Sequence, residues 1–80
     1  MEACPADWLV EQLTLEAIEA KLGRHASHPN WQQVKRLAQP GDEFWSFRSP
    51  PHTWPRKLGA AGYALVRAGV PVARFTIVRS

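Results

Sequence analysis

The sequence feature that most constrains the fold is the stretch 63–79, whose pattern predicts a β-hairpin. Two runs rich in apolar and β-branched residues, YALVR and VPVARFTIVR, are separated by Ala68 and Gly69. A two-residue loop between such runs favours a tight turn with antiparallel strands on either side. In this register the missing N–H of Pro71 points away from the neighbouring strand. We therefore expect the last strand to be an edge strand, at least near the turn.

The same register divides the hairpin into two faces, because successive side chains of a strand alternate. It places two small residues, Ala64 and Ala73, opposite each other, which leaves room for a helix, so their face is expected to form the core. This expected core face holds Ala64, Val66, Ala73, Phe75 and Ile77. The other face, which is half apolar and has two arginines, holds Tyr63, Leu65, Arg67, Val72, Arg74, Thr76 and Val78.

The N-terminal half, residues 1–40, is predicted to be helical. Apolar side chains at helical spacing indicate helical structure over 6–22, as one helix or as two. A further helix begins at Pro29, since proline is favoured in the first turn. Pro40 and Gly41 end this helical half.

The second half, residues 41–80, is predicted to form the sheet. Residues 43–48, EFWSFR, indicate a first strand, and a short helix is expected near 54–60 before the hairpin. The chain as a whole, 1–80, is therefore predicted to be one α+β domain. Two or three N-terminal helices would pack on a three-stranded antiparallel sheet, with a short helix between strands 1 and 2. The strand order is either 1-2-3 or an arrangement with the third strand in the centre.

Hydrophobic burial must supply most of the folding free energy of this chain. It has one cysteine, Cys4, so no internal disulfide can form. Its four tryptophans can each bury about 150–250 Å², and we expect them in the core. A hydrophobic fraction of 45% with 21% charged residues is typical of a globular domain.

The sequence predicts a cytoplasmic protein. No apolar run approaches the roughly 20 residues of a membrane span. The N-terminal sequence MEACPADWLVEQ is acidic and lacks the basic and apolar regions of a signal peptide. A single thiol also favours a reducing compartment.

Residues 41–80 contain a distinctive series of short motifs. In chain order these are Gly41-Asp42-Glu43, Trp45, Phe47, Ser49-Pro50-Pro51, Trp54, and Gly62-Tyr63-Ala64-Leu65-Val66-Arg67 with Gly69. The series resembles a group of small bacterial proteins of unknown function. The resemblance covers about half of the chain. It implies a bacterial, self-contained domain and supplies no activity and no site residues.

No arrangement of residues predicts catalysis or metal binding. His25, His28 and His52 are the acid–base candidates, but a nucleophile needs a base within reach and a third group to orient it. Cys4 near the N-terminus has no evident partner of this kind. His25 and His28 have the spacing of two ligands, whereas a structural zinc site takes four. We therefore expect no catalytic residue, no metal and no cofactor.

The half-apolar hairpin face predicts a binding surface. Its candidate residues are Tyr63, Leu65, Arg67, Val72 and Arg74, with Trp54 between prolines as a further docking position. An apolar face beside an edge strand favours a small non-catalytic protein-interaction domain, which binds a protein partner or forms a homodimer through its sheet. An alternative is that an N-terminal helix covers this face, so that the sheet is buried on both sides.

Weak binding of single-stranded nucleic acid by the basic sheet face is the alternative function. Residues 41–80 hold six Lys/Arg and two Asp/Glu, whereas residues 1–40 hold four and five. Tyr63 shares its predicted face with Arg67 and Arg74, and sheet surfaces bind single strands by stacking and phosphate contacts. The net charge of +3 is modest for such a function.

Overall fold

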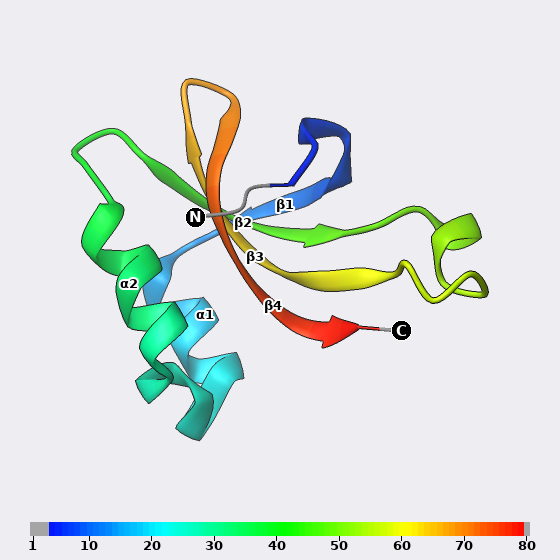
Figure 1. Cartoon of the computed structure of the whole chain (residues 1–80). Coiled ribbons are helices and arrows are strands. Elements are labelled where there is room, and N and C mark those ends of the chain that lie inside the picture. The colour runs from blue at the N-terminus through cyan, green and yellow to red at the C-terminus, as the bar shows by residue number, and fades with distance from the viewer. Residues whose placement is uncertain (1–3, 80) are drawn as a thin grey trace.

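The computed structural model describes residues 4–79, which form two α-helices and a four-stranded antiparallel sheet (Figure 1). The elements are, in order, β1 (Leu9–Leu13), α1 (Leu15–Leu22), α2 (Pro29–Leu37), β2 (Glu43–Arg48), β3 (Ala60–Arg67) and β4 (Val70–Arg79). Short 3₁₀ turns lie at Ala6–Trp8, Gly23–Ser27 and Pro51–Thr53. The strand order is β1-β2-β3-β4, so β4 lies at an edge, as predicted for the last strand.

Residues 9–13 form a strand, so the prediction of a three-stranded sheet below a helical N-terminal half is wrong. Leu9 and Leu13 both pair with β2. Their spacing of four residues fits one face of a regular helix or of a regular strand. In β1 an irregularity between Leu9 and Gln12 places the two leucines on opposite faces of the sheet. Thr14 sets the boundary, because its hydroxyl oxygen accepts a hydrogen bond from the Ala17 N–H at 3.1 Å and caps α1.

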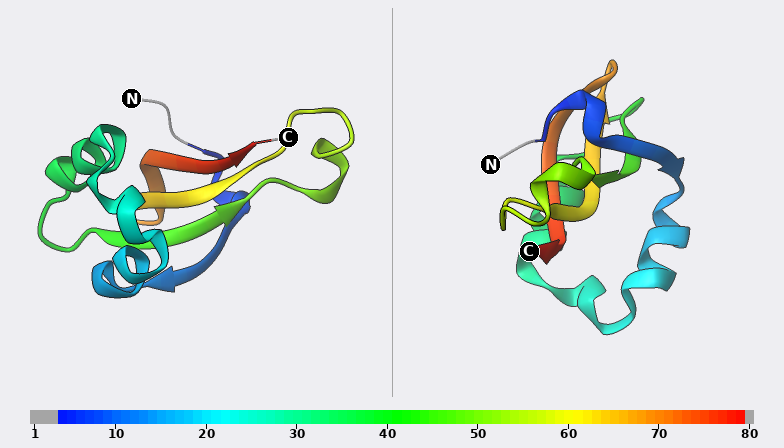
Figure 2. Two further views of the ribbon diagram at one scale, coloured as in Figure 1. Left: turned by 90° about the horizontal axis from the view of Figure 1, so that it is seen from below. Right: turned by 90° about the vertical axis from the view of Figure 1, so that its right-hand side faces the viewer.

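Both helices pack on one face of the sheet and cover only one end of it (Figure 2). The buried side chains of this first core are Ile18, Leu22, Trp31, Val34, Leu65, Ala73 and Phe75. Trp31 is fully buried, and its ring centroid lies 5.8 Å from that of Phe44 and 6.3 Å from that of Tyr63. These ring contacts fix α2 on the half of the sheet that includes Phe44, Tyr63 and Phe75.

A polar cluster fixes the two helices to each other. One carboxylate oxygen of Glu19 in α1 accepts hydrogen bonds from Trp31 Nε1 at 3.1 Å and from Lys35 Nζ at 2.7 Å. These bonds lower the pKa of Glu19, the bond from Lys35 most strongly. The indole N–H of a buried tryptophan is thus satisfied at the rim of the core.

A β-bulge shifts the hairpin register by one residue, so the predicted opposition of two alanines is wrong. Val66 pairs with Pro71, and Leu65 pairs with Ala73, which leaves Val72 as an extra residue between the two pairs. Proline is favoured at such an irregularity because it has no N–H to donate to the ladder. The bulge places Ala73 on the same face as Leu65, beneath the helices.

The opposite face of the sheet carries a second core. Its buried residues are Cys4, Phe47, Ala60, Ala64 and Val66. Trp8 and Leu9, from the segment that enters β1, pack against it together with Trp45. The centre of the sheet is therefore covered on both sides, as in the alternative arrangement that the sequence left open.

The connection between β2 and β3 is a structured loop in place of the short helix predicted near 54–60. Only Pro51–Thr53 is helical, as a 3₁₀ turn, and Pro55 lacks the N–H that a helix interior would need. The buried Ser49 organises the loop, because its hydroxyl oxygen accepts from the Ala60 N–H at 2.9 Å. Trp54 Nε1 donates to the Ser49 carbonyl oxygen at 3.2 Å.

Candidate binding groove

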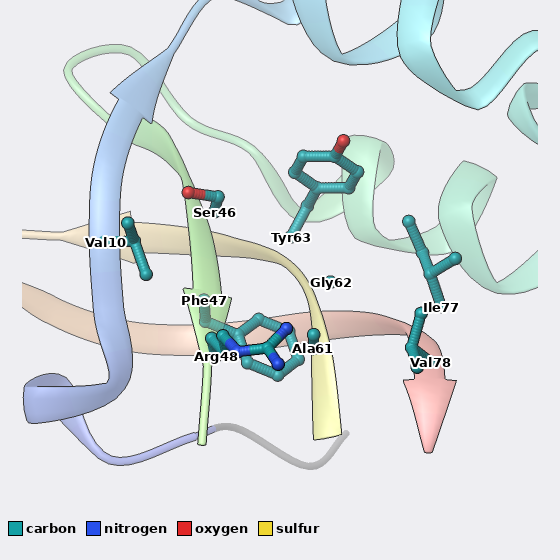
Figure 3. Close-up of a pocket in the computed structure, with 9 residues that line it drawn as sticks. All are labelled: Val10, Ser46, Phe47, Arg48, Ala61, Gly62, Tyr63, Ile77 and Val78. Carbon is teal, nitrogen blue, oxygen red and sulfur yellow. The ribbon is translucent and has the colours of Figure 1, made fainter. Parts of the chain in front are cut away.

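A groove lies on the helix-bearing face of the sheet, at the end that the helices leave open (Figure 3). Its volume is about 320 Å³. All four strands contribute to its lining, which consists of Val10, Ser46, Phe47, Arg48, Ala61, Gly62, Tyr63, Ile77 and Val78. Because the floor is a hydrogen-bonded sheet, the groove is preformed rather than assembled on binding.

The hollow shape follows from the sizes of the side chains on neighbouring strands. Small residues, Ala61 and Gly62 of β3, form the floor in the centre of the sheet. Larger residues stand on the two edge strands, where Val10 is 61% exposed, Ile77 45% and Val78 48%. Strands lie about 4.8 Å apart, so the edge strands are separated by roughly 14 Å. This width accommodates a single peptide segment, either extended or helical.

The two ends of the groove differ in chemistry. Tyr63 stands at the end nearest the helices (Figure 3), and burial raises the pKa of its hydroxyl, which therefore stays neutral. At the other end Arg48 is exposed, and its guanidinium carbon lies 4.6 Å from the ring centroid of Trp54. The stacking on Trp54 orients Arg48. The groove thus offers apolar walls, a hydroxyl group at one end and a cation at the other.

The positive charge of the molecule is concentrated in the second half of the sequence, and one of these cations, Arg48, lines the groove. Residues 44–80 contain six Lys/Arg and no Asp/Glu, a net charge of +6, whereas residues 1–43 carry −3. Arg67 is paired with Asp42 at the opposite end of β3, at 2.8 Å. The remaining cations of this part are Arg48, Arg56, Lys57, Arg74 and Arg79.

The apolar residues predicted for the binding face do not share an exposed surface. Leu65 is fully buried beneath the helices, and Val72 is half-buried against the first core, whereas Tyr63 lines the groove. Sequence reasoning misses Val10, because it assigns this residue to a helix. It also misses Ile77, because the unshifted register places this residue in the core.

The predicted basic residues are also separated from one another. Arg67 donates from Nε and Nη2 to the two carboxylate oxygens of Asp42, and these hydrogen bonds hold the pKa of Asp42 below its ordinary value. Arg74 lies on the opposite face, with its guanidinium carbon 5.8 Å from the ring centroid of Phe47. The predicted nucleic-acid surface of Tyr63, Arg67 and Arg74 is therefore spread over different parts of the molecule.

His28 and Cys4, two of the candidates for chemistry, have structural roles in the fold. His28 Nδ1 accepts a hydrogen bond from the Asn30 N–H at 3.1 Å at the start of α2, and its ring lies 5.3 Å from that of Phe75. Cys4 is buried in the second core, and burial raises the pKa of its thiol, which disfavours the reactive thiolate. Within residues 4–79, no three His, Cys, Asp or Glu side chains gather as a metal site would require.

Comparison of the chain with models of protein families, with curated proteins and with solved structures finds no match. The resemblance of residues 41–80 to small bacterial proteins of unknown function thus stays a prediction. In the described part of the chain, neither helix has the length and apolar character needed to cross a membrane.

Proposed function

We propose that this chain is a small non-catalytic protein-interaction domain, and that its groove holds an apolar segment of a partner protein. The observation that supports this proposal is the exposure of Val10, Ile77 and Val78, which is 61%, 45% and 48%, around a hollow floor. Apolar side chains gathered in a concave site favour binding. Complete burial of one such side chain contributes about 1.5–3 kcal/mol.

The charge around the groove favours a partner segment that also carries acidic residues. Arg48 stands at the open end, and none of the residues that line the groove is acidic. In a homodimer formed through this face, the Arg48 side chains of the two copies would carry like charge with no acidic groove residue to face them, which disfavours association. We therefore favour a different, acidic protein over a second copy as the occupant, and the test below distinguishes the two.

The proposal is tested with a peptide of alternating Glu and Leu, titrated into the ¹⁵N-labelled protein and followed by amide chemical shifts. A peptide of alternating Lys and Leu is the control for charge. We expect the acidic peptide to shift the amides of Gly62, Ile77 and Val78, because these residues line the groove. Amides in the helices should shift much less.

Two matched variants connect the binding to the groove. Ile77→Ser should weaken binding of the acidic peptide about tenfold, the change that loss of one buried aliphatic side chain produces. Val70→Ser is the control, because Val70 is 58% exposed on the same strand but lies outside the groove. Equal effects of the two variants, or equal binding of the basic peptide, would contradict the proposal. So would a stable dimer in sedimentation experiments at micromolar concentration that Ile77→Ser dissociates.

A cytoplasmic location goes with this proposal. The chain has one cysteine, and Cys4 is buried as a free thiol in the second core. Buried free thiols are typical of proteins in reducing compartments, whereas small secreted domains rely on several disulfides. Localisation of a tagged chain in its own host is the measurement that checks it.

A further inference from the structure

A second hollow lies on the opposite face of the sheet, beside the second core. Its volume is about 280 Å³. It is lined by Trp8, Lys57, Leu58, Gly59, Ala60, Arg74 and Arg79. Three of these side chains are cations and none is acidic, so the lining carries a net positive charge.

The cations reach this hollow from separate segments of the chain. Lys57 belongs to the loop before β3, and Arg79 lies at the end of β4, where it pairs with Ala60. Arg74 lies nearer the start of β4 and interacts within the protein, so Lys57 and Arg79 are the cations offered to a ligand. Bringing like charges together costs free energy unless an anion occupies the space between them.

The loop that carries Lys57 is held in one conformation. The Lys57 backbone has a φ of 60°, a left-handed conformation that is uncommon for a residue with a side chain. It is fixed by a hydrogen bond from the Lys57 N–H to the Trp54 carbonyl oxygen at 3.1 Å, and by one from the Leu58 N–H to the Thr53 carbonyl oxygen at 2.9 Å. The backbone that carries Lys57 is thus held in place before any ligand arrives, which lowers the entropic cost of binding.

We propose that this hollow is a binding site for the phosphate group of a small phosphate monoester, with Lys57 and Arg79 as its ligands. Phosphate carries up to two negative charges and is the anion best matched by several convergent Lys and Arg donors. Trp8 forms an apolar wall against which the organic part of the ester lies. The volume is at the small end of the range for ligand sites, so the ligand is a small molecule.

The test uses phenyl phosphate as the probe, with phenol and inorganic phosphate as separate arms. Titration at low ionic strength is followed by the indole N–H of Trp8 and the backbone amide of Ala60. We expect phenyl phosphate to cause saturable shifts, inorganic phosphate to bind more weakly, and phenol to have no effect. Raising the ionic strength to about 0.15 M should weaken binding of both phosphates, since exposed charges are screened over about 8 Å.

Glutamine variants remove the positive charge of each side chain and leave a polar amide in its place. Lys57→Gln and Arg79→Gln should each weaken phenyl phosphate binding about tenfold, the loss of one charge-assisted hydrogen bond. Arg56→Gln is the matched control, because Arg56 is the exposed neighbour of Lys57 and does not line the hollow. The affinity of this variant for phenyl phosphate should stay within about twofold of that of the parent, because an exposed charge outside the hollow is screened by solvent and salt.

Several outcomes would overturn this assignment. One is an equal loss of affinity in Arg56→Gln, which would mean diffuse attraction to a basic surface. Another is equal binding of phenol. A third is binding of an oligothymidylate without binding of phenyl phosphate, which would make this hollow part of a nucleic-acid surface. The groove variant Ile77→Ser should leave phosphate binding unchanged, because Ile77 does not line this hollow. The proposal for the groove and the proposal for this hollow can therefore be confirmed or contradicted independently.

Discussion

Shortening the side chains of two consecutive residues in β3, one at a time, tests whether the sheet is buried on both faces. Leu65 has no exposed surface and packs beneath the helices, whereas Val66 is 2% exposed and belongs to the second core. Leu65→Ala should lower the free energy of unfolding by about 2–5 kcal/mol. Val66→Ala removes two methyl groups and should cost about 2 kcal/mol. In a sheet with one solvated face, only one of two adjacent residues would carry such a cost.

The size of this effect relative to total stability makes it measurable. A domain of 80 residues is stable by about 4–12 kcal/mol. Each kcal/mol lowers the Tm of a domain of this size by about 4–8 °C, so Val66→Ala should melt roughly 8–16 °C below the parent. Urea unfolding followed by circular dichroism gives the free energies directly.

An exposed valine provides the control for β-propensity and solvation. Val78→Ala removes the same two methyl groups at a position that is 48% exposed, and should change stability by no more than about 0.5 kcal/mol. The reasoning would be refuted if either Leu65→Ala or Val66→Ala behaved like Val78→Ala. That result would mean that one face of the sheet is open to solvent.

Three further predictions concern local structure and pH. Thr14→Ala removes the cap of α1 and should cost about 1 kcal/mol in urea unfolding, since the β1–α1 boundary depends on it. Gly62→Ala would place a Cβ within overlap distance of the Phe75 carbonyl oxygen, so β3 and β4 must separate, with a loss of about 1–3 kcal/mol; an unchanged Tm would show that the strands are not so close. Hydrogen bonds from Arg67 lower the pKa of Asp42 from its ordinary 3.8, so this contribution to stability is complete above that value and lost as pH falls below it. Stability of Asp42→Asn should therefore fall less steeply than that of the parent between about pH 5 and pH 2 in thermal melts.

The predicted hairpin shows how far sequence pattern determines a strand pair. The turn at Ala68 and Gly69 forms where expected, with φ of 52° and 78°, and the last strand lies at the edge of the sheet. The register fails at Pro71, where the bulge begins. A prediction that treats proline only as a missing donor does not anticipate the inserted residue. The one-residue shift exchanges the faces of the side chains that follow, until a second irregularity opposite Ala61 and Gly62 shifts the register again.

The periodicity of the apolar residues could not identify the N-terminal strand. Five residues with leucines at both ends match a helix and a strand equally well, and the choice depends on a partner strand more than thirty positions away, at Phe44 and Phe47. The groove could not be inferred for the same reason. Its walls come from β1 and β4, one of which was assigned to a helix and the other to the wrong register.

The weak attachment of β1 to the rest of the sheet allows local opening of the protein. β1 pairs only with β2, and this pairing is irregular between Leu9 and Gln12. The segment from Cys4 to Leu9 covers the second core without help from either helix. Release of this arm would uncover Phe47 while the helices, β3 and β4 stay in place, so the molecule has a route of partial opening that needs no global unfolding. Amide protons of β1 should accordingly exchange with deuterium far sooner than those in the middle of β3.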